Sequence, residues 1–302
     1  MGYQTLDIAL SFKNNLVPLK RSIIITDTLS AQGNFLIHHF IVNQIKADKN
    51  VVLVGLSQLF NHYLNIGKKL VRRRILQRHA LLLKLTHLID IIILISIVKG
   101  VNLTSASQKG RFSFIDGLTS LTSNSPTVTS FPTAVLTPLS ITNCAKETLL
   151  NFYNTIKTII TTHHASTDSN VLLIFDDLSV LIYSGFKVRD VLEFWGACRV
   201  LIEKYNGTLV SLIHTDEVAE SLSTDNIDFD DEIFIKSLIY RSEYILSVRG
   251  LESGFSRDVS GEITIARGPK NFERWFRPST LHYKILDNNV QFFAKGFSQG
   301  VF

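Results

Sequence analysis

Cysteine is scarce in this sequence, with only Cys144 and Cys198 among 302 residues. Their separation fits no metal-ligand spacing, and two cysteines are too few for a disulfide framework, which excludes a disulfide-stapled secreted domain. The N-terminus lacks the basic start and the long apolar run of a signal peptide, and Leu6 breaks the myristoylation pattern. We therefore expect a reducing compartment, where the sequons at Asn102 and Asn206 stay unmodified.

Charge is also sparse: 19% of the residues are charged and 45% are hydrophobic. This composition excludes long disorder, and the length suits one domain, 1–302, with a real core. The formal net charge of +5 hints at nucleic acid. However, residues 71–99 hold six basic side chains against the single acid Asp90, so this segment supplies the whole excess. The rest of the chain is formally neutral.

Short β-branched runs alternate with helical patterns through the first two thirds of the chain. The sequence predicts strands at 22–26, 51–55, 111–117, 171–175 and 208–214, and helices at 31–46, 57–70 (with Ser57 as N-cap), 144–162, 188–205 and 231–240. Consecutive β segments follow at 243–251, 261–267, 281–287 and 290–296. The pattern predicts an α/β fold: a mostly parallel sheet flanked by helices, with extra antiparallel strands at the C-terminal edge. Residues 119–143, rich in Ser, Thr and Pro, are a predicted mobile surface loop.

The stretch "TDTLSAQGNFLIHH" (26–39) joins a strand to a helix, where nucleotide-binding folds place a phosphate loop. Such a loop needs glycines around the phosphates, a lysine for the outer phosphates and a hydroxyl for magnesium. With Gly33 aligned to the second glycine, the first is Thr28, the lysine is Asn34 and the hydroxyl is Phe35. A neutral amide cannot replace an ammonium, and a phenyl ring cannot bind magnesium. We expect an ordinary turn and no catalytic residue.

Two carboxylates, Asp176 and Asp177, follow the apolar run of the fourth strand. In nucleotide-binding folds, a carboxylate there lies beside magnesium. Without a phosphate loop we favour a structural role, in which Asp177 caps the next turn and Asp176 meets a neighbouring loop. His214 ends the next strand, where a γ-phosphate sensor would lie, but a lone histidine there is more often structural. No carboxylate or cysteine stands at metal spacing from the histidine pairs 38–39 or 163–164, so no metal or cofactor is predicted.

Seven collinear stretches carry a family resemblance: "GNFLIHHFI", "FNHYLNIGKKL", "GVNLTSASQKG", "FIDGL", "VLLIFDDLSVLI", "GLESGFSRDVSGEITI" and "YKILDNNVQFFAKGFS". They resemble the Elongator complex protein 6 family over nearly the whole chain, most specifically at 254–261 and 292–298. The resemblance implies a RecA-like fold that has lost its nucleotide-binding signatures, in keeping with Thr28, Asn34 and Phe35.

The same resemblance implies a subunit with no reaction of its own. It would form a hexameric ring with the fourth and fifth Elongator subunits, two copies of each, and join the remaining subunits. The ring would bind tRNA and support modification of the wobble uridine, with the chemistry in another subunit. We expect a location in the cytoplasm and the nucleus, without a membrane partner.

One segment departs from the family pattern, which runs uninterrupted from "FNHYLNIGKKL" to "GVNLTSASQKG". Here residues 71–99 separate the two halves, with an arginine cluster followed by an apolar run from Thr86 to Val98. A membrane span needs about twenty apolar residues, so the run is too short. An amphipathic surface helix is a second interpretation. We favour a third, a translated intron, because valine codons begin with GT, lysine can be encoded by AAG, and the segment replaces nothing in the family pattern.

The remaining candidates for tRNA or subunit contacts lie in "ARGPKNFERWFRP" (266–278), which interleaves basic and aromatic residues: Arg267, Lys270, Arg274, Trp275 and Arg277. Such interleaving suits phosphate contact with base stacking, and equally suits aromatic packing against a neighbouring subunit. A second hypothesis for the whole chain is a diverged RecA-like ATPase or recombinase paralogue acting on DNA. It predicts ATP binding in which Asp176 matters.

Overall fold

The computed structural model describes most of the chain, in eight ranges: 3–65, 103–122, 145–167, 170–215, 229–254, 256–272, 277–286 and 289–295. The 71–99 segment lies outside the described residues, as do Arg274, Trp275 and residues 123–143 of the predicted loop.

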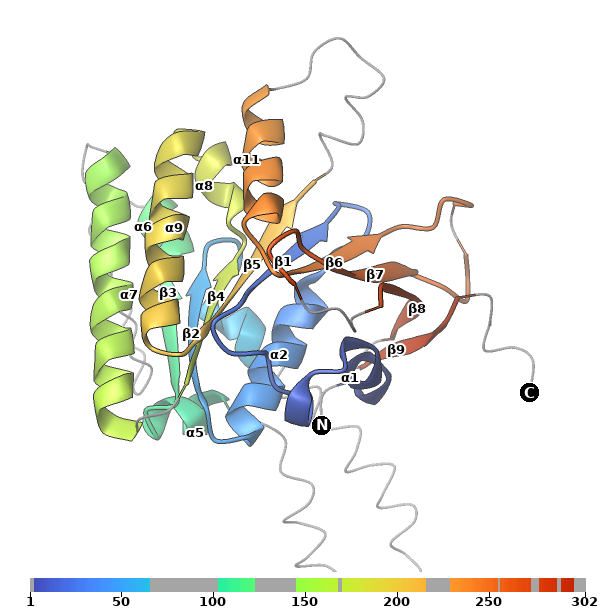
Figure 1. The fold of residues 1–302 in the computed structure, drawn as a ribbon, viewed down its shortest axis with the longest axis horizontal. Coiled ribbons are helices and arrows are strands. Elements are labelled where there is room, and N and C mark those ends of the chain that lie inside the picture. Colours follow the sequence, from blue (N-terminus) through green and yellow to red (C-terminus); the bar gives the residue numbers. More distant parts are fainter. Residues whose placement is uncertain are drawn as a thin grey trace, which may run out of the picture.

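A nine-stranded sheet crosses the described part of the molecule in the order β3-β2-β4-β5-β1-β6-β7-β8-β9 (Figure 1). Its strands are β1 (Ser22–Asp27), β2 (Asn50–Gly55), β3 (Phe112–Asp116), β4 (Val171–Asp176), β5 (Thr208–His214), β6 (Tyr244–Arg249), β7 (Gly261–Arg267), β8 (Ser279–Leu286) and β9 (Asn289–Ala294). Strands β3 to β6 in that order pair in parallel, and β6 to β9 pair antiparallel. The predicted fold class is confirmed.

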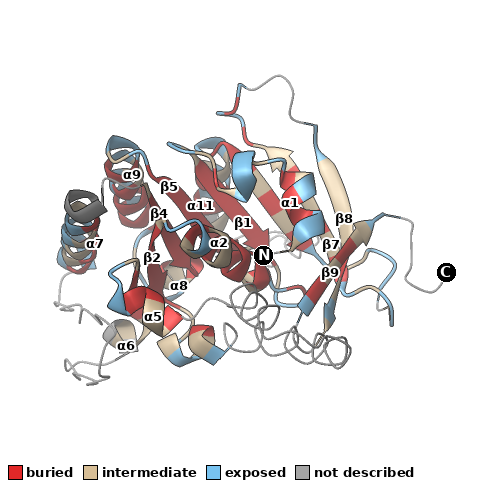
Figure 2. Ribbon diagram, turned by 90° about the horizontal axis from the view of Figure 1, so that it is seen from below, coloured by how far each residue is buried: buried red, intermediate tan, exposed pale blue. Residues whose placement is uncertain are grey.

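Helices cover both faces of the parallel part. They are α1 (Gln4–Leu10), α2 (Asn34–Lys46), α5 (Leu103–Gln108), α6 (Gly117–Thr122), α7 (Ala145–Thr167), α8 (Ser179–Tyr183), α9 (Val188–Lys204) and α11 (Phe229–Tyr240), with a short 3₁₀ turn at Lys13–Asn15. Helices α7, α9 and α11 pack on one face, and α1, α2 and α5 on the other (Figure 1). All residues of β1, β2 and β4 are therefore buried, which explains their continuous apolar runs (Figure 2).

The C-terminal strands follow a different pattern because helices cover only one of their faces. Along β6 and β7, buried residues alternate with partly exposed ones. The inward residues of β7, β8 and β9 join the cluster that also contains α1 and α2. This alternation distinguishes the antiparallel edge from the parallel part.

Three local predictions were wrong. Helix α2 begins at Asn34 rather than residue 31, because Thr28 and Ala31 form a tight turn in which the Ala31 N–H donates to the Thr28 carbonyl at 3.0 Å. Ser57 caps no helix, because the helical residues begin at 60 and its hydroxyl donates to Asp176.

The predicted 119–143 loop starts too early, because residues 119–122 belong to α6. Asp116 explains this helix: its carboxylate accepts the backbone N–H of Thr119 at 2.9 Å and the Thr119 hydroxyl at 2.8 Å. Such a side-chain acceptor satisfies N–H groups that the first helical turn leaves unpaired. The rest of the predicted loop lies outside the described residues.

The sequence analysis missed α1, which three polar contacts hold on α2. The backbone N–H of Tyr3 donates to Nδ1 of His39 at 3.0 Å, and His39 Nε2 lies 3.1 Å from Oδ1 of Asp7. Asn43 donates to the same Asp7 oxygen at 2.9 Å.

A buried ion pair holds the amino ends of the parallel strands together. Glu243, just before β6, accepts the backbone N–H and the hydroxyl of Ser22 at 2.7 Å each. Its other oxygen accepts from Arg199 of α9 at 2.6 Å, and only 4% of its side chain is exposed. Arg199 also donates to the Arg241 carbonyl at 2.6 Å. Glu243 thereby joins β1, β6 and α9.

Glu243→Ala is expected to lower the free energy of unfolding by about 3–5 kcal/mol, because it leaves the Arg199 charge and the Ser22 donors without their partner. Urea denaturation monitored by circular dichroism measures this. The matched control is Arg189→Ala, which breaks the exposed Arg189–Glu193 pair and should change little. Equal losses in the two variants would contradict this account of Glu243.

Candidate functional site

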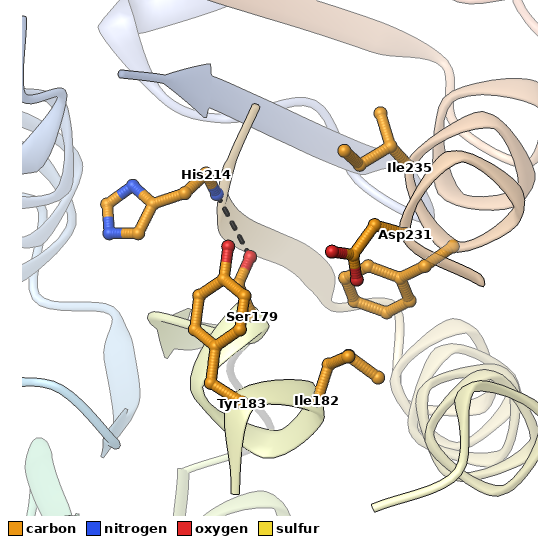
Figure 3. A pocket seen from close by; sticks show the side chains of 7 residues that line it. Ser179, Ile182, Tyr183, His214, Asp231 and Ile235 are labelled. Carbon is orange, nitrogen blue, oxygen red and sulfur yellow. Dashed lines mark hydrogen bonds between the residues drawn. The ribbon is translucent and has the colours of Figure 1, made fainter. Parts of the chain in front are cut away.

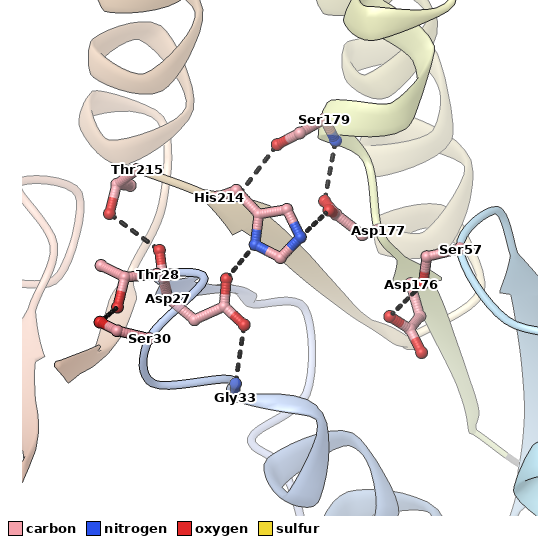
Figure 4. Close-up of polar contacts among 10 residues, drawn as sticks. All are labelled: Asp27, Thr28, Ser30, Gly33, Ser57, Asp176, Asp177, Ser179, His214 and Thr215. Carbon is pink, nitrogen blue, oxygen red and sulfur yellow. Dashed lines mark hydrogen bonds and ion pairs between the residues drawn. The ribbon is translucent and has the colours of Figure 1, made fainter. Parts of the chain in front are cut away.

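The carboxyl ends of three adjacent parallel strands bring their polar residues together (Figure 4). Asp27 ends β1, His214 ends β5, and Asp176 ends β4 with Asp177 directly after it. In open α/β sheets, ligands bind outside this edge of the sheet. The predicted phosphate-loop positions and the two predicted carboxylates therefore lie at one site.

His214 lies between two buried carboxylates (Figure 4). Its Nδ1 is hydrogen-bonded to Oδ1 of Asp27, and its Nε2 is 2.8 Å from Oδ2 of Asp177. Asp27 is fully buried and Asp177 is 1% exposed. Asp177 also accepts the backbone N–H of Ser179 at 2.9 Å, the position expected of a cap. One imidazole thus connects the ends of β1, β4 and β5.

The two carboxylates determine the protonation of His214. Contact with Asp177, followed by contact with Asp27, raises the pKa of His214 to about 10, although burial alone would lower it. At neutral pH the ring is therefore an imidazolium that neutralises part of the negative charge at this edge.

The loop between β1 and α2 places Gly33 against the same carboxylate. The Gly33 N–H donates to Oδ2 of Asp27 at 2.7 Å. At the N-terminus of a helix such N–H groups point toward a bound anion, for instance a phosphate. Here the chain's own Asp27 is that anion. A Cβ on Gly33 would lie 3.1 Å from Cγ2 of Ile25 and 3.3 Å from Cβ of Asp27, so the glycine permits this close approach.

The other loop positions serve the fold. Thr28 belongs to the turn that ends at Ala31, and Asn34 is the first residue of α2. Phe35 is 9% exposed, and its ring centroid lies 5.0 Å from that of Tyr283. The same centroid also lies 5.9 Å from the ring centroid of Phe292. The position where a phosphate loop has its magnesium-binding hydroxyl is therefore an aromatic contact with the C-terminal strands.

Asp176 points away from His214 and meets the segment after β2 (Figure 4). The Ser57 hydroxyl donates to its Oδ1 at 3.2 Å, and the Tyr63 hydroxyl donates to its Oδ2. The Asp176 carbonyl accepts from the Leu56 N–H at 2.6 Å. Burial raises the pKa of Asp176 to about 6, against the two hydroxyl donors that lower it. These contacts occupy both carboxylate oxygens.

A small cavity lies behind His214, between α8 and α11 (Figure 3). Its volume is about 10 Å³, and its lining includes Ser179, Tyr183, Asp231 and Phe234. The Ser179 hydroxyl accepts the backbone N–H of His214 at 2.9 Å in this cavity wall. The volume suits one water molecule, whereas ligand pockets measure about 300–1,000 Å³.

Within the described residues, the basic candidates lie at the opposite end of the parallel strands. Arg267 ends β7 opposite Tyr244, the first residue of β6, and Gly268 donates to the Glu243 carbonyl at 2.8 Å. Lys270 and Arg277 are exposed beside this turn. Phe272, 88% exposed, shares the turn. These residues are not brought to the carboxylate site.

Sequence reasoning missed two residues of the site. Asp27 directly follows the predicted strand 22–26, so the rule that singled out Asp176 would have found it. No pattern in the sequence around Tyr63 predicts its role in the site. Its hydrogen bond with Asp176 depends on how the helical residues that begin at 60 pack against β4. Within the described residues, no group of histidine, cysteine and acidic side chains is arranged to hold a metal, and no described helix is long and apolar enough to cross a membrane.

A family model described as Elongation complex protein 6 matches residues 3–79 and 76–287. The chain belongs to this family. Elongator complex protein 6 of Homo sapiens is 31% identical over 282 residues, covering 89% of this chain and 88% of the relative. That of Xenopus laevis is 29% identical over 280 residues, covering 90% and 89%. That of Dictyostelium discoideum is 24% identical over 354 residues, covering 93% and 92%.

Solved structures show the same fold at low sequence identity. An uncharacterized protein of Pyrococcus horikoshii, PH0321, solved in complex with an unknown peptide, superposes with a TM-score of 0.59 at 14% identity and covers 97% of this chain and 98% of its own. The KaiC-like protein PH0186 of the same organism gives a TM-score of 0.55 at 10% identity, covering 91% of each chain. The Elongator subunit thus has a RecA-like fold.

His214→Gln is expected to change how stability depends on pH. The folded chain holds the His214 proton to about pH 10, whereas the unperturbed pKa of histidine is about 6.5. The ion pairs of His214 therefore contribute their full stabilisation below pH 6.5, and this contribution falls as pH rises toward 10. The parent should lose stability with a slope of up to about 1.4 kcal/mol per pH unit that the variant lacks.

Urea denaturation of both proteins should be compared from pH 6.5 to about 7.5, below the unperturbed pKa of thiols, about 8.5, and of phenols, about 10. His282→Gln is the control, because His282 lies on β8, away from Asp27 and Asp177. If His214→Gln keeps the parent's slope, the imidazolium assignment is wrong.

Proposed function

We propose that this Elongator subunit is a non-catalytic member of a hexameric accessory ring with the fourth and fifth subunits, which binds tRNA and supports modification of the wobble uridine. The observation that supports the non-catalytic part is the carboxyl edge of the sheet, where Asp27 accepts the Gly33 N–H and His214 lies between Asp27 and Asp177. Family membership supports the complex. The proposal includes a cytoplasmic and nuclear location without membrane attachment, which imaging of a tagged chain tests.

Nucleotide binding by this chain alone would be costly. A phosphate at the α2 N-terminus would displace the Asp27 carboxylate from the Gly33 N–H, or lie beside it as a second negative charge. Asn34 offers no ammonium in compensation, and Phe35 is packed in the core. A diverged ATPase is the competing function, and the position of Asp176 at the end of β4 is the observation in its favour.

The two functions differ in ATP binding. We expect no binding of Mg-ATP tighter than about 1 mM in calorimetry on the purified chain. If it does bind, Asp176→Asn tests the site, because an ATPase that uses this carboxylate for magnesium would lose affinity. The control, Asp258→Asn, removes an exposed carboxylate whose partner is Lys284. Micromolar binding abolished by Asp176→Asn alone would favour the ATPase.

Ring assembly tests the complex and the 71–99 segment together. We propose that this segment is a translated intron, in support of which the two family matches meet inside it, at residues 76–79. The chain with and without residues 71–99 should be co-expressed with the fourth and fifth subunits and measured by size-exclusion chromatography with light scattering. We expect the shortened chain to form the six-membered ring.

Two other outcomes are informative. Assembly of both versions, with a cDNA that still encodes the segment, would make it a tolerated part of the protein. If neither version assembles, the ring assignment is wrong.

The basic turn after β7 is our candidate tRNA contact within the described residues. Arg267→Ala and Lys270→Ala in the assembled ring should each weaken tRNA binding for all tested tRNA sequences. Each should also reduce the slope of log K against log salt by roughly 0.7–1, because one phosphate contact is lost. Filter binding at several salt concentrations measures this. Arg189→Ala, a cation of α9 whose side chain is 85% exposed, is the control. Equal effects of all three variants would point to bulk charge instead.

A further inference from the structure

A basic surface forms where the central parallel strands begin, at the edge of the sheet opposite His214. The chain outside residues 71–99 is formally neutral, so its overall charge does not predict this surface. Exposed cations gather there from turns that are far apart in the sequence: Lys20, Lys204, Arg241, Lys270 and Arg277. We call these residues the amino-edge cations. Within the described residues, none of them forms an ion pair with an acid.

The strand order brings these cations to one edge. Strands β5, β1, β6, β7 and β8 are consecutive neighbours in the sheet. The backbone N–H of Lys20 donates to the Gly207 carbonyl at 2.7 Å, which places the segment before β1 beside the turn that follows Lys204. Helices α9 and α11 both end at this edge, directly before β5 and β6 (Figure 1). Because neighbouring strands lie 4.7–4.9 Å apart, the cations extend over roughly 19 Å.

The turn after β7 packs against the end of α11. The Gly268 N–H donates to the Glu243 carbonyl at 2.8 Å. A Cβ on Gly268 would lie 2.0 Å from the carbonyl oxygen of Ser242, so only glycine permits this close approach. Ser242 directly follows Arg241. Lys270 therefore lies on a turn that is held beside Arg241.

Arg277 reaches the same edge through β8. Strand β8 is antiparallel to β7, and its first residue, Ser279, pairs with Ile265. Arg277 comes two residues before Ser279, so it lies beside the carboxyl end of β7. The turn of Lys270 begins at that end of β7.

Acids do little to offset the amino-edge cations. Glu243, which lies between β1 and β6, is buried, and its carboxylate is 2.6 Å from Arg199. Among the described residues of the turns at this edge, Glu203 is the one exposed acid. The surface therefore has a positive potential, which attracts a polyanion.

An exposed aromatic ring lies among these cations. Phe272 is 88% exposed and belongs to the same turn as Lys270. Tyr240, the last residue of α11, is also exposed and directly precedes Arg241. Proteins that bind single-stranded nucleic acid combine cations for the phosphates with aromatic rings on which bases stack. This edge of the sheet has both kinds of group.

We propose that the amino-edge cations and Phe272 bind an unpaired loop of RNA. The cations contact phosphates along the loop, and one unstacked base lies on the Phe272 ring. This inference rests on the tRNA binding of the proposed function. It adds contacts from the segment before β1 and from the ends of α9 and α11, and it specifies which part of the RNA is bound. Paired RNA would use the cations alone, because its bases are stacked inside the helix.

Filter binding by the assembled ring at several salt concentrations tests the cations. Lys204→Ala and Arg241→Ala should each reduce the slope of log K against log salt by roughly 0.7 for a hairpin RNA with an unpaired loop, because one phosphate contact is lost. Lys187→Ala is the matched control, because Lys187 is an exposed lysine at the other end of α9 and should leave the slope unchanged.

Two substitutions of Phe272 test the stacked base. Phe272→Leu keeps an apolar side chain but removes the ring, so it should weaken binding of the hairpin at least about fivefold and leave binding of a fully paired duplex unchanged. Phe272→Tyr keeps the ring and should bind the hairpin like the parent. Because the side chain is exposed, both variants should keep the parent melting temperature.

Vesicles of phosphatidylcholine with phosphatidylserine test the other polyanion that such a surface attracts. An acidic membrane would be held by the same cations and by any apolar side chain at position 272. Flotation of the ring with these vesicles, reduced by Lys204→Ala and unaffected by Phe272→Leu, would assign the surface to lipid and overturn the RNA inference. We expect no flotation at physiological salt.

The outcomes separate this inference from the proposed function. If the ring binds tRNA but the Lys204, Arg241 and Phe272 variants bind the hairpin like the parent, the inference is wrong and the proposed function stands. Equal loss for hairpin and duplex in Phe272→Leu also contradicts the inference. If the parent ring binds no tRNA, that part of the proposed function fails and this inference fails with it. If no ring forms, the purified full chain replaces it in the same measurements.

Discussion

Three carboxylates are buried side by side at the carboxyl edge of the sheet, and the ion pair of His214 with Asp27 and Asp177 makes that burial tolerable. An unpaired buried carboxylate costs several kcal/mol, so each must have a donor or a cation. His214 supplies the cation for two of them, and the hydroxyls of Ser57 and Tyr63 serve Asp176. Because the strands are adjacent in the order β4-β5-β1, one imidazole connects the carboxyl ends of all three strands.

The same ion pair occupies the edge of the RecA-like sheet where a nucleotide phosphate would bind. The N-terminus of α2 follows β1, as a phosphate-binding helix would, but the Gly33 N–H there already donates to Asp27. Phe35 packs with Tyr283 and Phe292, so this turn also anchors the antiparallel strands. A fold used elsewhere for nucleotides thus has an internal ion pair at that edge.

The two ends of the sheet differ in how their charges are arranged. At the amino ends Glu243 is held by Arg199, and the basic turn of Arg267 and Lys270 lies beside it. At the carboxyl ends His214 is held by acids. The surface between β3 and α7 is distinct from both and is lined by apolar and neutral polar groups.

The sequence by itself determined the strands, because continuous apolar runs predict strands covered on both faces and alternating runs predict a sheet with one open face. It also excluded a lysine and a magnesium hydroxyl after β1, and placed Asp176 and Asp177 at a strand end. Only the tertiary structure decided what those groups meet. His214 lies 187 residues from Asp27, and Tyr63 lies 113 residues from Asp176. Contacts at such separations depend on strand order and helix packing, which local periodicity does not encode.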